Sequence, residues 1–250
     1  MITRSIPNLF TIGNLFLGII AIIFVFNEEA TLAAMMVIIA IIADGLDGRV
    51  ARALKVQSEF GKELDSLSDV ISFGVAPAFI VYVVSFQSLQ PPAAGWLVTA
   101  IFPICGALRL ARYNVVAASP GYFVGLPIPA AAGILSTLAL FSGSLHSAVL
   151  IVVTLLLSML MVSKIRYPSF KHIDIPMPMR WILLVASIAA VALVIVYPSH
   201  VTRFLFVPLV LYALYGLKKN VDRRGSDSDD EDSECVLLNL DMDESVKTET

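Results

Sequence analysis

The chain has 250 residues, of which 58% are hydrophobic and only 15% are charged, and its mean hydropathy is +0.84. A soluble domain of this size does not need so large an apolar fraction, so the composition excludes an ordinary soluble protein and predicts an all-α bundle with several membrane spans. The formal net charge of −3 says little about partners, because an acidic C-terminal segment dominates it, and we expect no nucleic-acid partner.

The hydropathy pattern predicts eight helices, separated by breaks that contain residues which end helices or favour turns. In chain order the expected helices are 8–26, 31–54, 61–86, 93–116, 127–143, 146–163, 180–197 and 201–218. They define a transmembrane domain over residues 1–220. Residues 221–250 are largely acidic and polar, which predicts a disordered cytoplasmic tail that is either simply solvated or docks a partner.

The basic residues predict the orientation of these helices. With a cytoplasmic N-terminus, the outside loops fall near 27–31, 87–93, 143–147 and 197–202, and none of these loops contains Lys or Arg. Of the 17 Lys and Arg residues, only Arg203 falls on that side. This asymmetry follows the positive-inside rule. It predicts an integral protein of the cell membrane whose acidic residues within the spans lie toward the cytoplasm.

Four aspartates interrupt the apolar sequence near the end of the second expected helix and the start of the third. Asp44 and Asp47 are three residues apart, and Asp65 and Asp69 are four apart, so each pair lies on one face of a helix. A charged side chain at the centre of a bilayer costs about 2.5–3.5 kcal/mol on insertion scales, and such residues are functional by default. Two pairs that face each other could hold two divalent cations such as Mg²⁺ or Mn²⁺, which prefer carboxylate oxygens.

Small residues and an arginine accompany the aspartates. Gly48 and Gly61 leave room for close approach to the backbone, and Ala51 is small as well. Arg52 offers a planar fork that suits phosphate, so the group describes a site for a diphosphate. The alternative is that the aspartates form salt bridges with basic neighbours at the membrane interface, which would leave the glycines unexplained. Those basic neighbours are Arg49, Arg52, Lys55 and Lys62.

The whole pattern resembles the signature of the CDP-alcohol phosphotransferases, integral membrane enzymes of phospholipid synthesis. It reads Asp44-x-x-Asp47-Gly48-x-x-Ala51-Arg52, then Gly61-x-x-x-Asp65-x-x-x-Asp69, and it meets all eight fixed positions of that signature. The resemblance implies a helix bundle, commonly a homodimer, with a CDP-linked lipid as donor, an alcohol as acceptor, divalent metal catalysis and release of CMP.

The resemblance also implies roles for single residues. It makes Asp44, Asp47 and Asp65 metal ligands, and it makes Asp69 both the general base and a further metal ligand. It also implies a cradle for the cytidine diphosphate of the donor lipid. The residues of that cradle are Asp44, Gly48, Ala51, Arg52, Gly61 and Asp65.

Flanking segments resemble the bacterial and archaeal phosphatidylserine synthase branch of this family, and the resemblance extends over about residues 5–218. The segments are PNLFTIGNLFLG at 7–18, SLSDVISFGVAPA at 66–78, ALRLARYN at 107–114 and FVGLPIPAAA at 123–132. They imply CDP-diacylglycerol, or an ether-lipid counterpart, as donor and L-serine as acceptor. We expect direct attack by the serine hydroxyl, because no activated Ser, Cys or His accompanies the carboxylates.

The carboxylate of a serine acceptor requires a cation in the site. Arg109 and Arg112 are three residues apart at a cytoplasmic helix end and therefore share a face. Arg112 and Asn114 are the first choices for acceptor binding, with Lys164 and Arg166 in reserve. The alternative for each basic residue is an anchor that holds a helix end at the lipid headgroups.

Other functions compete with this prediction. The same fold could use glycerol 3-phosphate, inositol phosphate or inositol as acceptor, although a phosphorylated acceptor would demand more cationic side chains. A cation-coupled transporter also carries carboxylates within the membrane, but such proteins often show inverted repeats, which we do not find in this sequence. A non-catalytic membrane scaffold that docks partners through its acidic tail is the third alternative.

Overall fold

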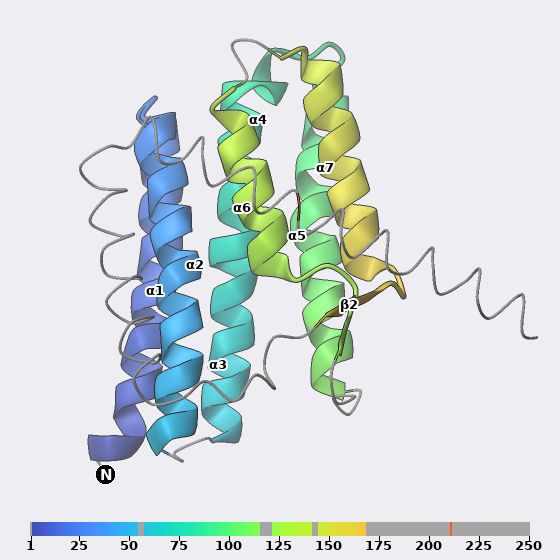
Figure 1. Cartoon of the computed structure of the whole chain (residues 1–250). Coiled ribbons are helices and arrows are strands. Elements are labelled where there is room, and N and C mark those ends of the chain that lie inside the picture. The colour runs from blue at the N-terminus through green and yellow to red at the C-terminus, as the bar shows by residue number, and fades with distance from the viewer. Residues whose placement is uncertain (1, 55–57, 116–121, 142–144, 169–210, 212–250) are drawn as a thin grey trace, which may run out of the picture.

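Figure 1 shows the computed structural model of the protein, a bundle of helices that run roughly parallel and antiparallel to one another. The structure describes residues 2–54, 58–115, 122–141, 145–168 and 211. The predicted helices 180–197 and 201–218, except for the helical residue Leu211, and the predicted tail 221–250 lie outside the described residues. The count of eight helices and the boundary of the tail therefore stay predictions.

The first two helices, α1 (Ile2–Phe26) and α2 (Ala30–Leu54), form an antiparallel pair at one side of the bundle (Figure 1). Glu28, in the turn between them, has a φ of 66°. The N–H of Glu29 donates to the carbonyl oxygen of Phe24 at 2.9 Å, so the turn satisfies the last carbonyls of α1 in the manner of a Schellman motif. A turn this short keeps the two helices side by side.

The third predicted helix, 61–86, is observed from Glu59 to Val84, and its winding changes twice. It consists of α3 (Glu59–Asp69), the π-helical segment η1 (Val70–Val75) and α4 (Ala76–Val84). Pro77 lies in the first turn of α4 and has no N–H to donate, so a uniform α-helical hydrogen-bond ladder cannot continue through this point. The wide turn of η1 begins directly after Asp69, and π-helical turns are frequent at functional sites.

The remaining elements complete the bundle. A short 3-10 helix, η2 (Phe86–Ser88), leads to α5 (Pro92–Val115), which is followed by α6 (Ile128–Ala139) and α7 (Ser147–Val162). The sequence analysis did not predict two short strands, β1 (Tyr122–Val124) and β2 (Arg166–Pro168), which pair antiparallel and join the chain before α6 to the chain after α7. Apart from this pair, the described elements are helices.

The distribution of apolar side chains is that of a membrane protein. Within the described residues, Asn8–Phe26, Glu59–Val84 and Pro92–Val115 are long and apolar enough to cross a bilayer. Large apolar side chains are exposed on α1, α5 and α7, including Phe16 and Leu97. In contrast, α6 is almost entirely buried and forms the centre of the bundle. The exposed apolar faces are therefore the surfaces that lipid would cover.

Small and hydroxyl residues join α1 to the helix that carries Asp69. The Ser68 hydroxyl donates to the carbonyl oxygen of Thr11 at 3.1 Å, and the Ser72 hydroxyl donates to that of Asn14 at 2.9 Å. A Cβ at Gly18 would lie 2.5 Å from Ser72 Oγ and 2.7 Å from Ser72 Cα. These contacts place α1 parallel to α3 and η1, at a separation that only a residue without a side chain permits.

Replacing Gly18 by alanine should destabilise the protein by about 1–3 kcal/mol, because the new methyl group collides with the backbone at Ser72. The matched control is Gly13→Ala on the same helix, where a Cβ meets nothing within 4 Å. That change should leave the stability unchanged or raise it, since alanine favours helix by about 1 kcal/mol over glycine. Thermal unfolding of the two variants in detergent checks the opposite signs, and equal unfolding temperatures would contradict the close contact.

Candidate active site

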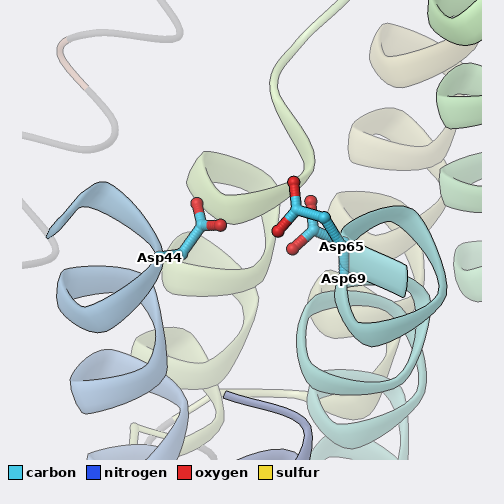
Figure 2. Close-up of side chains that lie close together, drawn as sticks. All are labelled: Asp44, Asp65 and Asp69. Atoms are coloured by element: carbon cyan, nitrogen blue, oxygen red, sulfur yellow. The ribbon is translucent and has the colours of Figure 1, made fainter. Parts of the chain in front are cut away.

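Three of the four predicted aspartates converge between two helices. Asp44 lies on α2, and Asp65 and Asp69 lie one turn apart on α3. One carboxylate oxygen from each of the three lies within 4.8 Å of the others. Figure 2 shows Asp44 extending from α2 toward the side of α3 that carries Asp65 and Asp69. Asp44 and Asp65 are half-buried, whereas Asp69 is only 8% exposed.

Three negatively charged carboxylates at this separation repel one another, and positive charge nearby would stabilise them. Two like charges about 4 Å apart repel by about 4 kcal/mol at an effective dielectric constant of about 20. A divalent cation among them would turn this repulsion into attraction, and hard carboxylate oxygens from separate helices are a donor set that suits Mg²⁺ or Mn²⁺. The geometry of Asp44, Asp65 and Asp69 therefore fits a divalent metal. The structure thus brings three of the four predicted aspartates together, and their role as metal ligands stays a prediction.

The rest of the predicted diphosphate cradle is described in part. Asp47, Gly48, Ala51 and Arg52 lie on α2, which is continuous to Leu54, but their side chains lie outside the described residues. The fourth metal ligand and the phosphate-binding role of Arg52 stay predictions.

Gly61 lies in the first turn of α3, close to the side chains of Ser58 and Asn8. Its N–H donates to the Ser58 hydroxyl at 3.0 Å, and Ser58 is the N-cap of the helix. A Cβ at Gly61 would lie 3.1 Å from both Ser58 Oγ and Asn8 Oδ1. A larger residue here would therefore require the Asn8 or Ser58 side chain to move by a few tenths of an ångström.

The C-terminal half of α5 packs beside the aspartate-bearing helix. The Asn114 side-chain amide donates to the Ser66 hydroxyl at 2.9 Å, immediately after Asp65. Higher on α5, Pro103 approaches Gly74, where a Cβ would lie 3.3 Å from the proline Cα. Arg109 lies between Pro103 and Asn114 on α5, so it is at the level of Asp69 on the neighbouring helix. It is also buried, with only 7% of its surface exposed. A buried guanidinium at the same depth as a group of carboxylates is a feature of a binding site.

The other predicted acceptor residues have different surroundings. The Arg112 guanidinium donates to the carbonyl oxygens of Val162 at 2.9 Å, Ser163 at 3.1 Å and Val124 at 3.4 Å. It thereby ties the end of α5 to the end of α7 and to β1. Lys164 is exposed, and Arg166 pairs with Val124 across the two strands, its side chain lying outside the described residues. Acceptor binding by these residues stays a prediction.

Sequence reasoning assigned no role to Asn14, although the residue stood within one of the quoted flanking segments. Asn14 is fully buried in α1, and neither atom of its side-chain amide has a hydrogen-bond partner among the described residues. The available signal was a polar amide in the middle of an apolar span, because burying such a group costs free energy unless it is hydrogen-bonded.

Comparison with known proteins identifies the class of this bundle. The sequence profile described as CDP-alcohol phosphatidyltransferase matches residues 4–164, well over half of the chain. The chain therefore belongs to the CDP-alcohol phosphatidyltransferase family, and it is a transferase of the membrane.

Several relatives are named for one member reaction of this family. The chain is 38% identical to a CDP-diacylglycerol--serine O-phosphatidyltransferase of Helicobacter pylori, over 84% of this chain and 89% of the relative. It is 37% identical to the protein of the same name from Bacillus subtilis, over 66% of this chain and 91% of the relative. It is 34% identical to that from Methanocaldococcus jannaschii, over 87% of this chain and 94% of the relative. The similarity thus spans nearly the whole length of bacterial and archaeal relatives.

Proposed function

We propose that this protein transfers the phosphatidyl group of CDP-diacylglycerol to the hydroxyl of L-serine, giving phosphatidylserine and CMP. The observation that carries the proposal is the convergence of Asp44, Asp65 and Asp69, because the reaction needs both a holder for divalent cations and a base. The choice of serine is supported by two relatives that are named for this activity and that align with 84% and 87% of this chain.

Asp69 is the proposed general base. The serine oxygen forms a bond to the phosphorus attached to the lipid, the bond between that phosphorus and the oxygen of CMP breaks, and the hydroxyl proton passes to an Asp69 carboxylate oxygen. Asp69 suits this role because it is the most buried of the three aspartates and lies at the end of α3, where η1 begins. The proton leaves the alcohol as the new bond forms, so the reaction needs no covalent enzyme intermediate.

The donor site combines metal-holding and phosphate-binding residues. Asp44, Asp47, Asp65 and Asp69 would hold the divalent cations, which supply positive charge against the diphosphate when they are bound. Gly48, Ala51 and Gly61 provide close approach, and Arg52 binds a phosphate oxygen. The lipid tails stay in the bilayer while the cytidine diphosphate enters from the cytoplasmic face, where the basic residues gather. We further propose that the protein resides in the cell membrane as a homodimer.

Arg109 is the proposed partner of the serine carboxylate. It is buried at the level of Asp69, the proposed base, whereas Arg112 lies at the end of α5, where its guanidinium donates to carbonyl oxygens of Val162, Ser163 and Val124. A guanidinium and a carboxylate form strong, directional hydrogen bonds. Asn114, which donates to the Ser66 hydroxyl next to Asp65, is a further candidate for acceptor binding, and Lys164 and Arg166 are second choices.

Replacing Arg109 by glutamine should raise the KM for serine about 10- to 100-fold, because a charge-assisted hydrogen bond contributes about 1.5–3 kcal/mol. The KM for CDP-diacylglycerol should change little. The matched control is Arg112→Gln, which should lower the unfolding temperature by several degrees because three carbonyls lose their donor, while the KM for serine stays the same. Steady-state kinetics and thermal unfolding of both variants check the assignment, and the reverse pattern would exchange the two roles.

The acceptor itself is tested by CMP release from the purified protein with CDP-diacylglycerol and Mg²⁺ or Mn²⁺. Parallel reactions contain L-serine, glycerol 3-phosphate, inositol phosphate, inositol or no acceptor. We expect CMP release that depends on serine and a lipid product that contains serine. Release with glycerol 3-phosphate but not with serine would overturn the acceptor assignment and keep the family chemistry. Cation flux in liposomes without any CMP release would overturn both.

A further inference from the structure

The amide of Asn14 is a buried polar group that the reaction scheme above does not use. Its side chain is 0% exposed, and neither Nδ2 nor Oδ1 has a hydrogen-bond partner among the described residues. A primary amide offers two donors and two acceptor sites, and leaving them all unsatisfied in an apolar bundle is costly. Such a group in a native protein requires an explanation, and a ligand that arrives later is one.

Contacts with η1 place Asn14 at the depth of the aspartates. Its own carbonyl oxygen accepts from the Ser72 hydroxyl, and the carbonyl oxygen of Thr11, one turn earlier, accepts from the Ser68 hydroxyl. Asp69 follows Ser68 directly. Because α1 and α3 run in parallel here, Asp69 lies between the levels of Thr11 and Asn14.

The pairing of α1 with α2 also places Asn14 at the depth of the aspartates. Asn14 is 12 residues before the end of α1 at Phe26, and Asp44 is 14 residues after the start of α2 at Ala30. With a rise of 1.5 Å per residue, two antiparallel helices joined by a short turn bring these residues within about 3 Å of the same height. Helical side chains also lean toward the N-terminus of their helix, which in α1 is the direction of Asp44. The amide therefore lies at about the same depth in the bundle as the aspartate group.

Asn14 and Arg109 approach this group from different sides. Figure 1 shows α3 between the α1–α2 pair and α5. Asn14 belongs to the buried stripe of α1 that also contains Thr11, Gly18, Ala21 and Val25. Asn14 and Arg109 thus lie at the depth of Asp69 on two helices that both pack against the helix carrying the aspartates.

We propose that Asn14 is a specificity-determining residue that binds the ammonium group of the acceptor. This inference rests on the proposed function, in which the acceptor is serine and Arg109 takes its carboxylate. The amide oxygen of Asn14 can accept from an ammonium group without adding a fourth negative charge beside Asp44, Asp65 and Asp69. The amide nitrogen can at the same time donate to an oxygen of the acceptor, which satisfies both ends of the side chain.

The test uses Asn14→Leu, which keeps the approximate size of the side chain and removes its polar atoms. The KM for serine should rise about 10- to 100-fold, as expected for the loss of a hydrogen bond to a charged group, while the KM for CDP-diacylglycerol stays the same. In the absence of substrates the variant should unfold at the same temperature or higher, because an unsatisfied buried amide is gone. A residue with a merely structural role would lower the unfolding temperature instead.

The matched control is Ser136→Ala. The Ser136 hydroxyl is also fully buried without a partner among the described residues, but it lies on α6. It is eight residues beyond Ile128, the α6 residue that contacts Gly74 and Gly106. From there α6 runs alongside α4, away from the aspartates. This variant should match the stability behaviour of Asn14→Leu without any change in the KM for serine.

Acceptor analogues identify which group Asn14 recognises. Competition against serine is measured with 3-hydroxypropanoate, which lacks the ammonium group, and with ethanolamine, which lacks the carboxylate. Asn14→Leu should weaken ethanolamine and leave 3-hydroxypropanoate unchanged, whereas Arg109→Gln should do the opposite. An unchanged KM for serine in Asn14→Leu, or equal weakening of both analogues, would overturn the inference. If the wild-type protein did not use serine at all, the proposed function would fail first, which separates the two failures.

Discussion

Asp69→Asn should lower the rate of CMP release at saturating substrates by about 10²–10⁴-fold, the usual contribution of a positioned general base. Asparagine has nearly the same shape as aspartate and can fill the same buried site, but it cannot take the proton of the serine hydroxyl. The carboxylate lies within 4.8 Å of those of Asp44 and Asp65, so the substitution also removes negative charge that a cation would use. The measurement is CMP release in mixed micelles at saturating serine and CDP-diacylglycerol.

The control for this result is Glu63→Gln on the same helix. Glu63 is exposed and lies before Asp65 on α3, so it carries the same charge without belonging to the aspartate group. This variant should retain wild-type activity. The two variants should also unfold at similar temperatures, which would exclude a damaged fold as the reason for lost activity. Full activity in Asp69→Asn would assign the proton to another base and would remove the main argument for the mechanism.

Asp44→Asn should raise the concentration of Mg²⁺ or Mn²⁺ needed for half-maximal activity by about 10-fold or more, because loss of a charge-assisted ligand costs about 1.5–3 kcal/mol. Asp44 is the described aspartate that α2 contributes, so its loss leaves the cation held mainly by α3. Chelation of divalent cations should reduce CMP release to background in the wild-type protein, and added Mg²⁺ or Mn²⁺ should restore it.

A second readout separates metal binding from catalysis. A cation that binds only the folded protein stabilises it in proportion to its occupancy. Mn²⁺ should therefore raise the unfolding temperature of the wild-type protein and of Glu63→Gln, and the effect should be much smaller in Asp44→Asn. If Mn²⁺ stabilised all three proteins equally, the three aspartates would not be the metal site, whatever the activities were.

The helices were predictable where hydropathy and breaks agree. The expected 31–54 and 93–116 match α2 and α5 to within a residue or so at each end, because long apolar runs end at NEEAT, QPP and a polar segment. The division of the third helix was not predicted, since hydropathy is uniform through Val70–Val75 and only Pro77 signals a change of winding. The strands were missed because each has only three residues, which is too short for a periodic pattern.

In the candidate site, too, sequence spacing predicted some features, and others depend on packing between distant parts of the chain. Helical spacing predicted that the aspartates share faces, and the structure brings Asp44, Asp65 and Asp69 together. Spacing could not distinguish Arg109 from Arg112, which are equally basic and lie one turn apart. Their difference comes from the end of α7, whose carbonyls receive the Arg112 guanidinium. Such a partner is distant in the chain and leaves no local signal.

The wide turn of η1 has a consequence for how the sequence of this protein can change in length. An α-helix turns by about 100° per residue, so one residue more or fewer between Asp69 and Pro77 would rotate the aspartates relative to α4. Ser68 and Ser72 would then lose their places against α1, and the carboxylates would turn away from Asp44. Surface loops accept insertions and deletions readily. In this short stretch, however, the number of residues is as strongly constrained as their identity.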